Sequence, residues 1–216
     1  MRESPRIRRL RTDLKALERL RDESSILDFL IPQPLPNGPP EAYLVRFRGI
    51  GLWRPSGSGE VLIREQHEVS IRLGASYPRM MPELAWKTPI FHPNISAGGV
   101  VCLGGYGLHW VPSLNLDELC VMLWDMVRYA NFDVKSAYNR EAALWARDQT
   151  AYRLPVDPRP LRDRIAGLAA SAATALPPRT IAATPVPAAD VLFIDGEAVV
   201  DAEIVESEDS DVLFIE

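Results

Sequence analysis

The stretch YPRMMPELAWKTPIFHPNISAGGVVCLGGYGLHWVP, residues 77–112, is the part of the sequence from which its fold can be inferred. Across residues 89–115, prolines and glycines recur so often that neither the two-residue period of a strand nor the 3.6-residue period of a helix survives. A segment of this length without regular structure, inside a compact domain, is usually functional. Cys102 lies within it, although a lone cysteine between Val101 and Leu103 would by itself be interpreted as a buried apolar residue.

Regular elements are predicted on both sides of this segment. Residues 4–23 predict an amphipathic helix, capped by Ser4 and started by Pro5, with an apolar stripe at spacings of three and four: Ile7, Leu10, Leu14, Leu17 and Leu20. A proline-rich connector leads to candidate strands, and helical periods return after the segment. The prediction is an α+β domain with an N-terminal helix, a four-stranded antiparallel meander (42–50, 61–65, 68–75 and 83–88), the irregular segment, and C-terminal helices (116–130 and 136–152).

Fixed spacings make residues 77–112 specific. His92, Pro93 and Asn94 form a tripeptide, and Cys102 follows the asparagine by eight residues. Trp110 follows the cysteine by another eight, and the register is completed by Tyr77, Pro78, Pro82, Trp86, Thr88 and Pro112. An isolated His-Pro-Asn tripeptide would be weak evidence. Because all these positions keep the same spacings together, the sequence resembles the core of ubiquitin-conjugating enzymes over roughly residues 4–150.

The resemblance implies a thioester chemistry centred on Cys102. A thiol attacks an incoming thioester at almost no thermodynamic cost and then leaves readily when an amine attacks. The resemblance also implies that the Asn94 amide stabilises the oxyanion of that attack, although a structural role in the loop is equally compatible with this residue. His92 is interpreted as structural rather than as a general base, and the resemblance places Pro93, Trp110 and Pro112 around the site in the same way.

An acidic residue some thirty positions beyond the cysteine often orients or deprotonates the attacking lysine in this family. Asp133 is the candidate here, with an ordinary helix-capping aspartate as an equally supported alternative. Val134 occupies the position where a second acidic residue or a serine would be expected. Cys120 falls on the buried stripe of the helix predicted at 116–130, so we expect it to be part of the core.

Several positions depart from the family pattern. Met81 replaces the first of two usual prolines, Gly104 replaces an aspartate two residues past the cysteine, and residues 53–60 replace a glycine-proline segment. These departures indicate a divergent member, and an Arg- and Ala-rich composition favours a prokaryotic source. The resemblance further implies that the first helix docks an activating enzyme, with an acidic partner surface steered by four arginines: Arg6, Arg8, Arg9 and Arg11.

The last third of the sequence differs in composition from the rest. We predict a conjugating domain at 1–153, a Pro/Ala-rich linker with one short helix (160–175) at 154–189, and an acidic tail at 190–216. The tail contains two VLFI repeats, which either add as a strand to a ubiquitin-like modifier or pair with the protein's own sheet edge. The repeats consist of Val191, Leu192, Phe193 and Ile194, and of Val212, Leu213, Phe214 and Ile215.

Composition excludes several other classes of function. Two cysteines without a CxxC pair and three scattered histidines predict no metal site, no cofactor and a reducing, cytoplasmic location. No apolar run reaches the length of a membrane span, and the basic residues are not interleaved with aromatic ones as in nucleic-acid binders. The expected partners are a ubiquitin-like modifier, an activating enzyme, a protein substrate and, undecided from the sequence, a ligase.

Two alternatives to a conjugating enzyme were weighed. A noncatalytic module that binds the modifier on the same fold is disfavoured by Cys102 in register, and a thiol hydrolase lacks a histidine placed to activate the cysteine. The sequence contains only three lysines, Lys15, Lys87 and Lys135, against 21 arginines. Codon bias explains this scarcity adequately, and an enzyme that delivers acyl groups to amines would also gain from offering few of its own.

Overall fold

Helix α1 (Pro5–Glu23) begins the fold, in a computed structural model that describes residues 3–36, 38–55, 59–103 and 110–166. Its first turn is capped as predicted, because the Ser4 side chain accepts a hydrogen bond from the Ile7 N–H at 3.2 Å and Pro5 has no N–H that would need an acceptor. Leu10, Leu17 and Leu20 are fully buried, so the apolar stripe faces the core.

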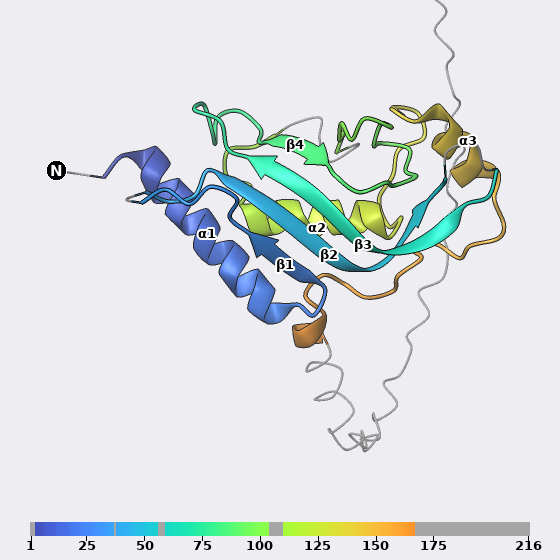
Figure 1. The fold of residues 1–216 in the computed structure, drawn as a ribbon, viewed down its shortest axis with the longest axis horizontal. Coiled ribbons are helices and arrows are strands. Elements are labelled where there is room, and N and C mark those ends of the chain that lie inside the picture. Colours follow the sequence, from blue (N-terminus) through green and yellow to red (C-terminus); the bar gives the residue numbers. More distant parts are fainter. Residues whose placement is uncertain (1–2, 37, 56–58, 104–109, 167–216) are drawn as a thin grey trace, which may run out of the picture. The chain divides into compact units, whose positions relative to one another are not determined.

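Four antiparallel strands follow in the order β1-β2-β3-β4 (Figure 1). They are β1 (Leu27–Leu30), β2 (Ala42–Trp53), β3 (Leu62–Arg72) and β4 (Glu83–Trp86). The predicted four-stranded meander is confirmed, but its division along the chain was partly wrong. The candidate strands at 61–65 and 68–75 are one continuous strand, because the polar run from Arg64 to Gln66 pairs with β2 despite its charge, and β1 is the strand that the prediction missed.

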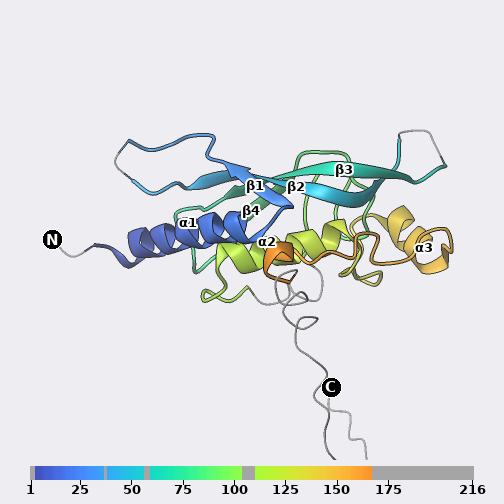
Figure 2. The ribbon, with the colours of Figure 1, turned by 90° about the horizontal axis from the view of Figure 1, so that it is seen from below.

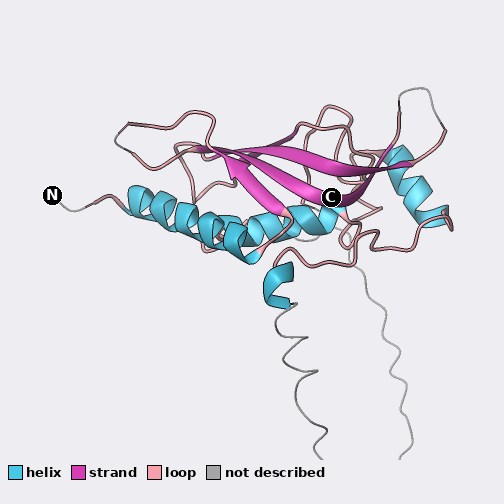
Figure 3. Ribbon diagram, turned by 60° about the horizontal axis from the view of Figure 1, so that its bottom comes forward, coloured by secondary structure: helices cyan, strands magenta, loops and turns pink. Residues whose placement is uncertain are grey.

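Helices α1 and α2 (Leu116–Val127) cover the same face of the sheet, while α3 (Arg140–Asp148) lies towards the other end of the domain (Figures 2 and 3). No helix of the described residues covers the opposite face (Figure 3). The core forms where α2 meets β2, and there the Trp124 ring packs against Phe47 with 6.0 Å between ring centroids. Cys120 is completely buried in this core, which confirms its expected place.

Both C-terminal helices are shorter than predicted, for local reasons. Helix α2 ends at Val127 because Tyr129 adopts a left-handed backbone conformation, with φ of 60°. Helix α3 starts only at Arg140 because Asn139 is its N-cap: the Asn139 backbone is extended and its side chain accepts from the Ala142 N–H at 3.0 Å, while its own N–H donates to the Pro93 carbonyl at 2.8 Å. The loop between the two helices is thereby fixed to the irregular segment.

The chain beyond α3 stays packed on the domain past residue 153, where a linker was expected to begin. The Asp157 carboxylate accepts a hydrogen bond from the Ile50 N–H at 3.0 Å, in the irregular stretch of β2 between Arg48 and Gly51. The Trp124 indole donates to the Arg159 carbonyl at 2.9 Å, and Leu161 is buried in the core. We call residues 154–163 the anchoring segment, because their contacts fix the chain to the sheet and to α2.

The last described residues of the chain are helical. Helical structure resumes at residues 163–166, within the range predicted for a short helix, and the chain from 167 onward lies outside the described residues. The rest of the predicted linker and both VLFI repeats fall in that part, and Gly104 also lies outside the described residues.

Candidate active site

Cys102 is fixed by its backbone to the His-Pro-Asn turn. Its N–H donates to the Asn94 carbonyl at 2.9 Å, one step beyond the isolated bridge that pairs Ile95 with Val101. The neighbours Val101 and Leu103 are buried, whereas Cys102 itself is half-buried. Short antiparallel pairing therefore holds the thiol at the surface while the residues on each side anchor it to the core.

A tight turn before the cysteine is built around Gly99. Its φ of +81° is one that side chains rarely tolerate, and a Cβ there would overlap the Trp86 carbonyl oxygen. The Gly99 carbonyl accepts from the Trp86 N–H at 2.8 Å, and the Ser96 hydroxyl accepts from the Val100 N–H at 3.0 Å. Close backbone approach to β4 is thus the reason for glycine at this position.

The Asn94 side chain bridges the cysteine segment to the loop between α2 and α3. Its amide nitrogen donates to the carbonyls of Asp133 at 2.9 Å and Ser136 at 3.3 Å, and its oxygen accepts from the Asp133 N–H at 2.7 Å. Asn94 is only 1% exposed. Both amide hydrogens are therefore engaged with backbone, and an oxyanion would have to displace the longer of the two bonds.

His92 is completely buried with both ring nitrogens occupied. Nδ1 accepts from the Asn94 N–H at 3.1 Å, so the proton is on Nε2, which faces the Asn131 carbonyl at 3.3 Å. Burial lowers the pKa of His92 to about 3, and the ring packs edge-on against Tyr129 at 5.0 Å between centroids. A neutral imidazole with no free nitrogen has the contacts of a structural residue rather than those of a general base.

Asp133 lies in the loop between α2 and α3, whose backbone the Asn94 side chain binds. Its carboxylate accepts from the Lys135 N–H at 2.8 Å, and this backbone bond, followed by contacts with Ser136 and the Lys135 charge, lowers the pKa of Asp133 below its ordinary value. The carboxylate is consequently ionised at neutral pH. Its side chain is partly exposed and its neighbour Val134 is 39% exposed, so the loop presents one anion beside an apolar surface.

Trp110 and Pro112 anchor the part of residues 89–115 that follows Cys102; residues 89–115 are called the active-site segment below. The Trp110 indole donates to the Pro78 carbonyl at 2.6 Å, and its ring lies 6.0 Å from that of Tyr77. The Pro112 carbonyl accepts a hydrogen bond from Arg9 of α1. The segment is therefore tied to the first helix as well as to the sheet.

Of the four arginines expected to face a partner, Arg9 points inward. Its guanidinium bonds Asp13 at 2.8 Å, the Tyr77 hydroxyl at 2.9 Å and the Pro112 and Leu114 carbonyls, and its side chain is 14% exposed. Asp13 is a functional neighbour that the prediction overlooked. It interrupts the apolar stripe of α1 four residues after Arg9, and that spacing could have indicated a buried ion pair.

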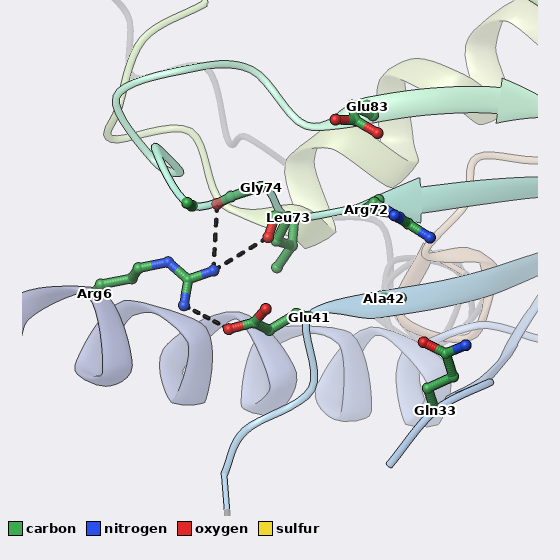
Figure 4. Close-up of a pocket in the computed structure, with 9 residues that line it drawn as sticks. Arg6, Gln33, Glu41, Ala42, Arg72, Leu73, Gly74 and Glu83 are labelled. Carbon is green, nitrogen blue, oxygen red and sulfur yellow. Dashed lines mark hydrogen bonds and ion pairs between the residues drawn. The ribbon is translucent and has the colours of Figure 1, made fainter. Parts of the chain in front are cut away.

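The other three arginines are more accessible. Figure 4 shows Arg6 pairing with Glu41 at 2.6 Å and donating to the Leu73 and Gly74 carbonyls at 3.2 Å each, which joins α1 to the ends of β2 and β3. Arg8 is exposed, and Arg11 is exposed with an ion pair to Glu3 at 2.7 Å. Arg8 and Arg11 are therefore the best placed of the four for a partner.

Two kinds of site are missing from the described part of the chain. Within it, no group of three or more His, Cys, Asp or Glu side chains could bind a metal ion. A search of the same residues finds no helix that is long and apolar enough to cross a membrane.

Comparison with known proteins agrees with this geometry. Residues 58–158 match the family model described as ubiquitin-conjugating enzyme. This part of the chain is similar to ubiquitin-conjugating enzymes. Among its relatives, Ubiquitin-conjugating enzyme E2 16 of Schizosaccharomyces pombe is 34% identical over 90 residues, which cover 40% of this chain and 55% of the relative.

A second relative in the ubiquitin-conjugating enzyme family is the "Probable NEDD8-conjugating enzyme Ubc12-like" of Arabidopsis thaliana. It is 33% identical over 79 residues, or 37% of this chain and 42% of the relative, so the chain spans about half the length of these curated relatives. The solved structure of Saccharomyces cerevisiae Ubc12 has the same fold, with a TM-score of 0.51 and 19% identity over 69% of this chain and 75% of that one.

Several residues that mark the ubiquitin-conjugating enzyme family have structural contacts here. Thr88 accepts from the Glu68 N–H at 3.1 Å, the Tyr77 hydroxyl donates to Asp13 at 2.7 Å, and Trp86 stacks on Phe47 at 6.5 Å. Asn94 and Trp110 bond backbone, as described above. The spacing that identifies the family thus reflects, in large part, the bonds that fold the active-site segment around Cys102.

Proposed function

We propose that this protein accepts a ubiquitin-like modifier from an activating enzyme as a thioester on Cys102 and transfers it to an amine of a protein substrate. The single observation behind this proposal is that a half-buried thiol is fixed through Asn94 to the loop that carries Asp133. Both curated relatives are named as conjugating enzymes, one for ubiquitin and one for NEDD8, which supports the same class of reaction.

In the loading step, the Cys102 thiolate attacks the thioester carbonyl carbon on the activating enzyme. A new carbon–sulfur bond forms, the old one breaks, and the activating enzyme's thiolate leaves, so the exchange is nearly neutral in free energy. The buried Cys120 is unsuited to this step, because burial and the nearby Asp117 raise the pKa of its thiol.

In the transfer step, the acceptor amine attacks the thioester on Cys102, and the cysteine leaves as a thiolate. Asp133, ionised and partly exposed, supplies a carboxylate that orients the incoming ammonium group and accepts its proton as a general base. Asn94 positions this carboxylate by bonding the Asp133 backbone on both sides. Its direct donation to the oxyanion remains a prediction, since it requires exchange of the 3.3 Å bond to Ser136.

We also propose a cytoplasmic location and an activating enzyme that docks on α1. Both cysteines are free thiols, and a reducing compartment keeps them so. The exposed Arg8 and Arg11 would attract an acidic surface of the activating enzyme. The VLFI repeats, which lie outside the described residues, remain candidates for a second contact with the modifier.

Charging assays test the proposal directly. With ATP and the matching activating enzyme, ubiquitin or NEDD8 should form an adduct with the protein that thiol reductant removes. Cys102→Ala should form none, Cys102→Lys should form one that resists reductant, and Cys120→Ala serves as the matched control that still charges. The alternative, a noncatalytic binding module, predicts retention of the modifier without any covalent adduct, so a folded protein that only binds would overturn the enzyme proposal.

A further inference from the structure

The three lysines of the chain lie in very different surroundings. Lys15 is on α1, Lys87 follows β4, and Lys135 lies in the loop between α2 and α3. The acidic C-terminal stretch from residue 180 onward contains no lysine. Intramolecular acyl transfer from Cys102 to a lysine therefore has only three candidate acceptors.

Lys135 lies in the loop that the Asn94 side chain fixes to the cysteine segment. Asn94 accepts the Cys102 N–H on its own carbonyl at 2.9 Å, and its side chain donates to the carbonyls of Asp133 at 2.9 Å and Ser136 at 3.3 Å. The two accepting carbonyls flank Lys135 in the sequence. One residue and two hydrogen bonds thus separate the cysteine from the loop that carries this lysine.

The charge around Lys135 also suits an acceptor. Asp133 accepts the Lys135 N–H at 2.8 Å, and the Lys135 charge is among the causes that lower the pKa of the Asp133 carboxyl, so the ammonium lies within reach of that carboxylate's field. Lys135 is exposed, and among the residues that the structure describes no carboxylate lies within ion-pair distance of it. Its amine is therefore exposed, with no ion pair to any described carboxylate that would hold it in place.

The other two lysines are directed elsewhere. Lys87 follows the pairing of Ala85 with Val100, and because that pairing is antiparallel, Lys87 lies alongside the Gly98 end of the turn, away from Cys102. Its N–H is bound to the Glu68 carbonyl at 2.8 Å. Lys15 belongs to α1, which lies at the end of the domain opposite α3 (Figure 2).

We propose that Lys135 is a built-in acceptor, modified by the acyl group that Cys102 of the same chain carries. The inference rests on the proposed thioester function. The Lys135 amine attacks the thioester carbonyl, a carbon–nitrogen bond forms, the carbon–sulfur bond breaks, and Cys102 leaves as a thiolate while the nitrogen releases its proton to water. A molecule that carries the modifier on Cys102 and meets no substrate would thereby modify its own Lys135.

The first experiment uses the full chain with ubiquitin or NEDD8, the matching activating enzyme and ATP, without substrate. A reductant-resistant adduct should accumulate after the thioester, and peptide mass spectrometry should place it on Lys135. Lys135→Arg should reduce its rate by roughly tenfold or more, as expected for loss of a well-placed intramolecular group. The double variant Lys15→Arg/Lys87→Arg is the matched control and should behave as wild type.

The outcomes separate this inference from the function on which it rests. Normal thioester loading with no stable adduct, or with an adduct on Lys15 or Lys87, would overturn the role of Lys135 and leave the conjugating function intact. Loss of the thioester itself in the wild-type protein would count against the proposed function. Mixing the charged protein with a tagged Cys102→Ala copy tests transfer within one chain, and modification of the tagged copy would contradict it.

A second experiment needs no activating enzyme or modifier. A small thioester of acetylglycine exchanges with accessible thiols, so it should acylate Cys102 and then pass its acyl group to Lys135. Mass spectrometry should find acetylglycyl-Lys135 in the wild-type chain and at least roughly tenfold less in Cys102→Ala. Equal acylation of all three lysines, or Lys135 acylation that persists without Cys102, would overturn the proposed proximity.

Discussion

At the scale of single residues, the active-site segment depends on backbone positions as much as on reactive groups. Gly99 allows the chain to pass directly against β4. All three side-chain hydrogen bonds of Asn94 are made to the loop that contains Asp133. The Cys102 thiol is attached to this framework by one backbone hydrogen bond. Reactivity at Cys102 should therefore be sensitive to changes that never touch its sulfur.

Gly99→Ala tests this dependence. A methyl group at φ of +81° would overlap the Trp86 carbonyl, so we expect the free energy of unfolding to drop by about 1–3 kcal/mol and thioester loading to slow. Gly98→Ala is the matched control, because a Cβ there would meet only the Ser96 hydroxyl at 3.9 Å. Urea denaturation and single-turnover charging measure both effects, and equal behaviour of the two variants would contradict the argument.

The site residues were predictable from sequence to different degrees. The spacing from Asn94 to Cys102 and Trp110 indicated the segment because those spacings are set by bonds within it. The engagement of Asn94 with Ser136 was not predictable, since no local pattern links residues 42 positions apart. Tyr129 was missed for the same reason: its left-handed backbone and its bond to the Phe91 carbonyl have no signal in a helical period.

At the scale of elements, α1 has an inner and an outer set of arginines. Arg9 and Asp13 form a buried ion pair that joins the helix to Tyr77 and to the start of α2, where the Leu116 N–H donates to Asp13 at 3.2 Å. Arg8 and Arg11 remain exposed. One helix thereby fixes the active-site segment and also presents a positive surface.

Substitution of these arginines should separate the two roles. Arg9→Ala leaves the Asp13 carboxylate buried without its cation, so we expect a loss of roughly 3–5 kcal/mol in the free energy of unfolding. Arg8→Ala/Arg11→Ala should leave stability within about 0.5 kcal/mol of wild type but slow charging, most at low salt. Thermal unfolding and charging rates at two salt concentrations measure this, and an unstable Arg8→Ala/Arg11→Ala protein would contradict the division.

The elements that sequence periodicity described well are those with a long amphipathic stripe, such as α1. Strand β1 escaped prediction because Leu27 and Phe29 are its only buried positions, too few to establish a period. Strand β3 was divided because His67 is a polar residue on its buried side, following a polar run. Tertiary pairing with β2 decides both cases, and pairing is invisible in one segment alone.

At the scale of the whole molecule, two buried histidines make stability depend on pH. Burial lowers the pKa of His92 to about 3 and that of His67 to about 4, below the value of about 6.5 in an unfolded chain. Protonation therefore favours the unfolded state, and stability is complete above about pH 6.5 and falls as pH decreases. The carboxylates with lowered pKa, such as Asp157, add their loss only below about pH 4.

Denaturation by urea at pH 7.0 and pH 5.0 measures this linkage. Below pH 6.5 we expect a loss of roughly 1.4 kcal/mol per pH unit for each of the two histidines. His67→Gln should reduce the slope by about half, whatever its effect on stability at pH 7. A free energy of unfolding that stays constant between these pH values would contradict the burial of neutral imidazoles.

The anchoring segment has a practical meaning for anyone who handles this protein. The Asp157 carboxylate accepts from the Ile50 N–H, which lies where the pairing of β2 with β3 is interrupted. The Arg159 carbonyl accepts from the Trp124 indole in the core. A gene shortened to residue 153 would encode a product with exposed core surface at the place of Leu161 and two orphaned donors. Fusions, reporters and truncated expression clones should therefore keep the whole anchoring segment, residues 154–163.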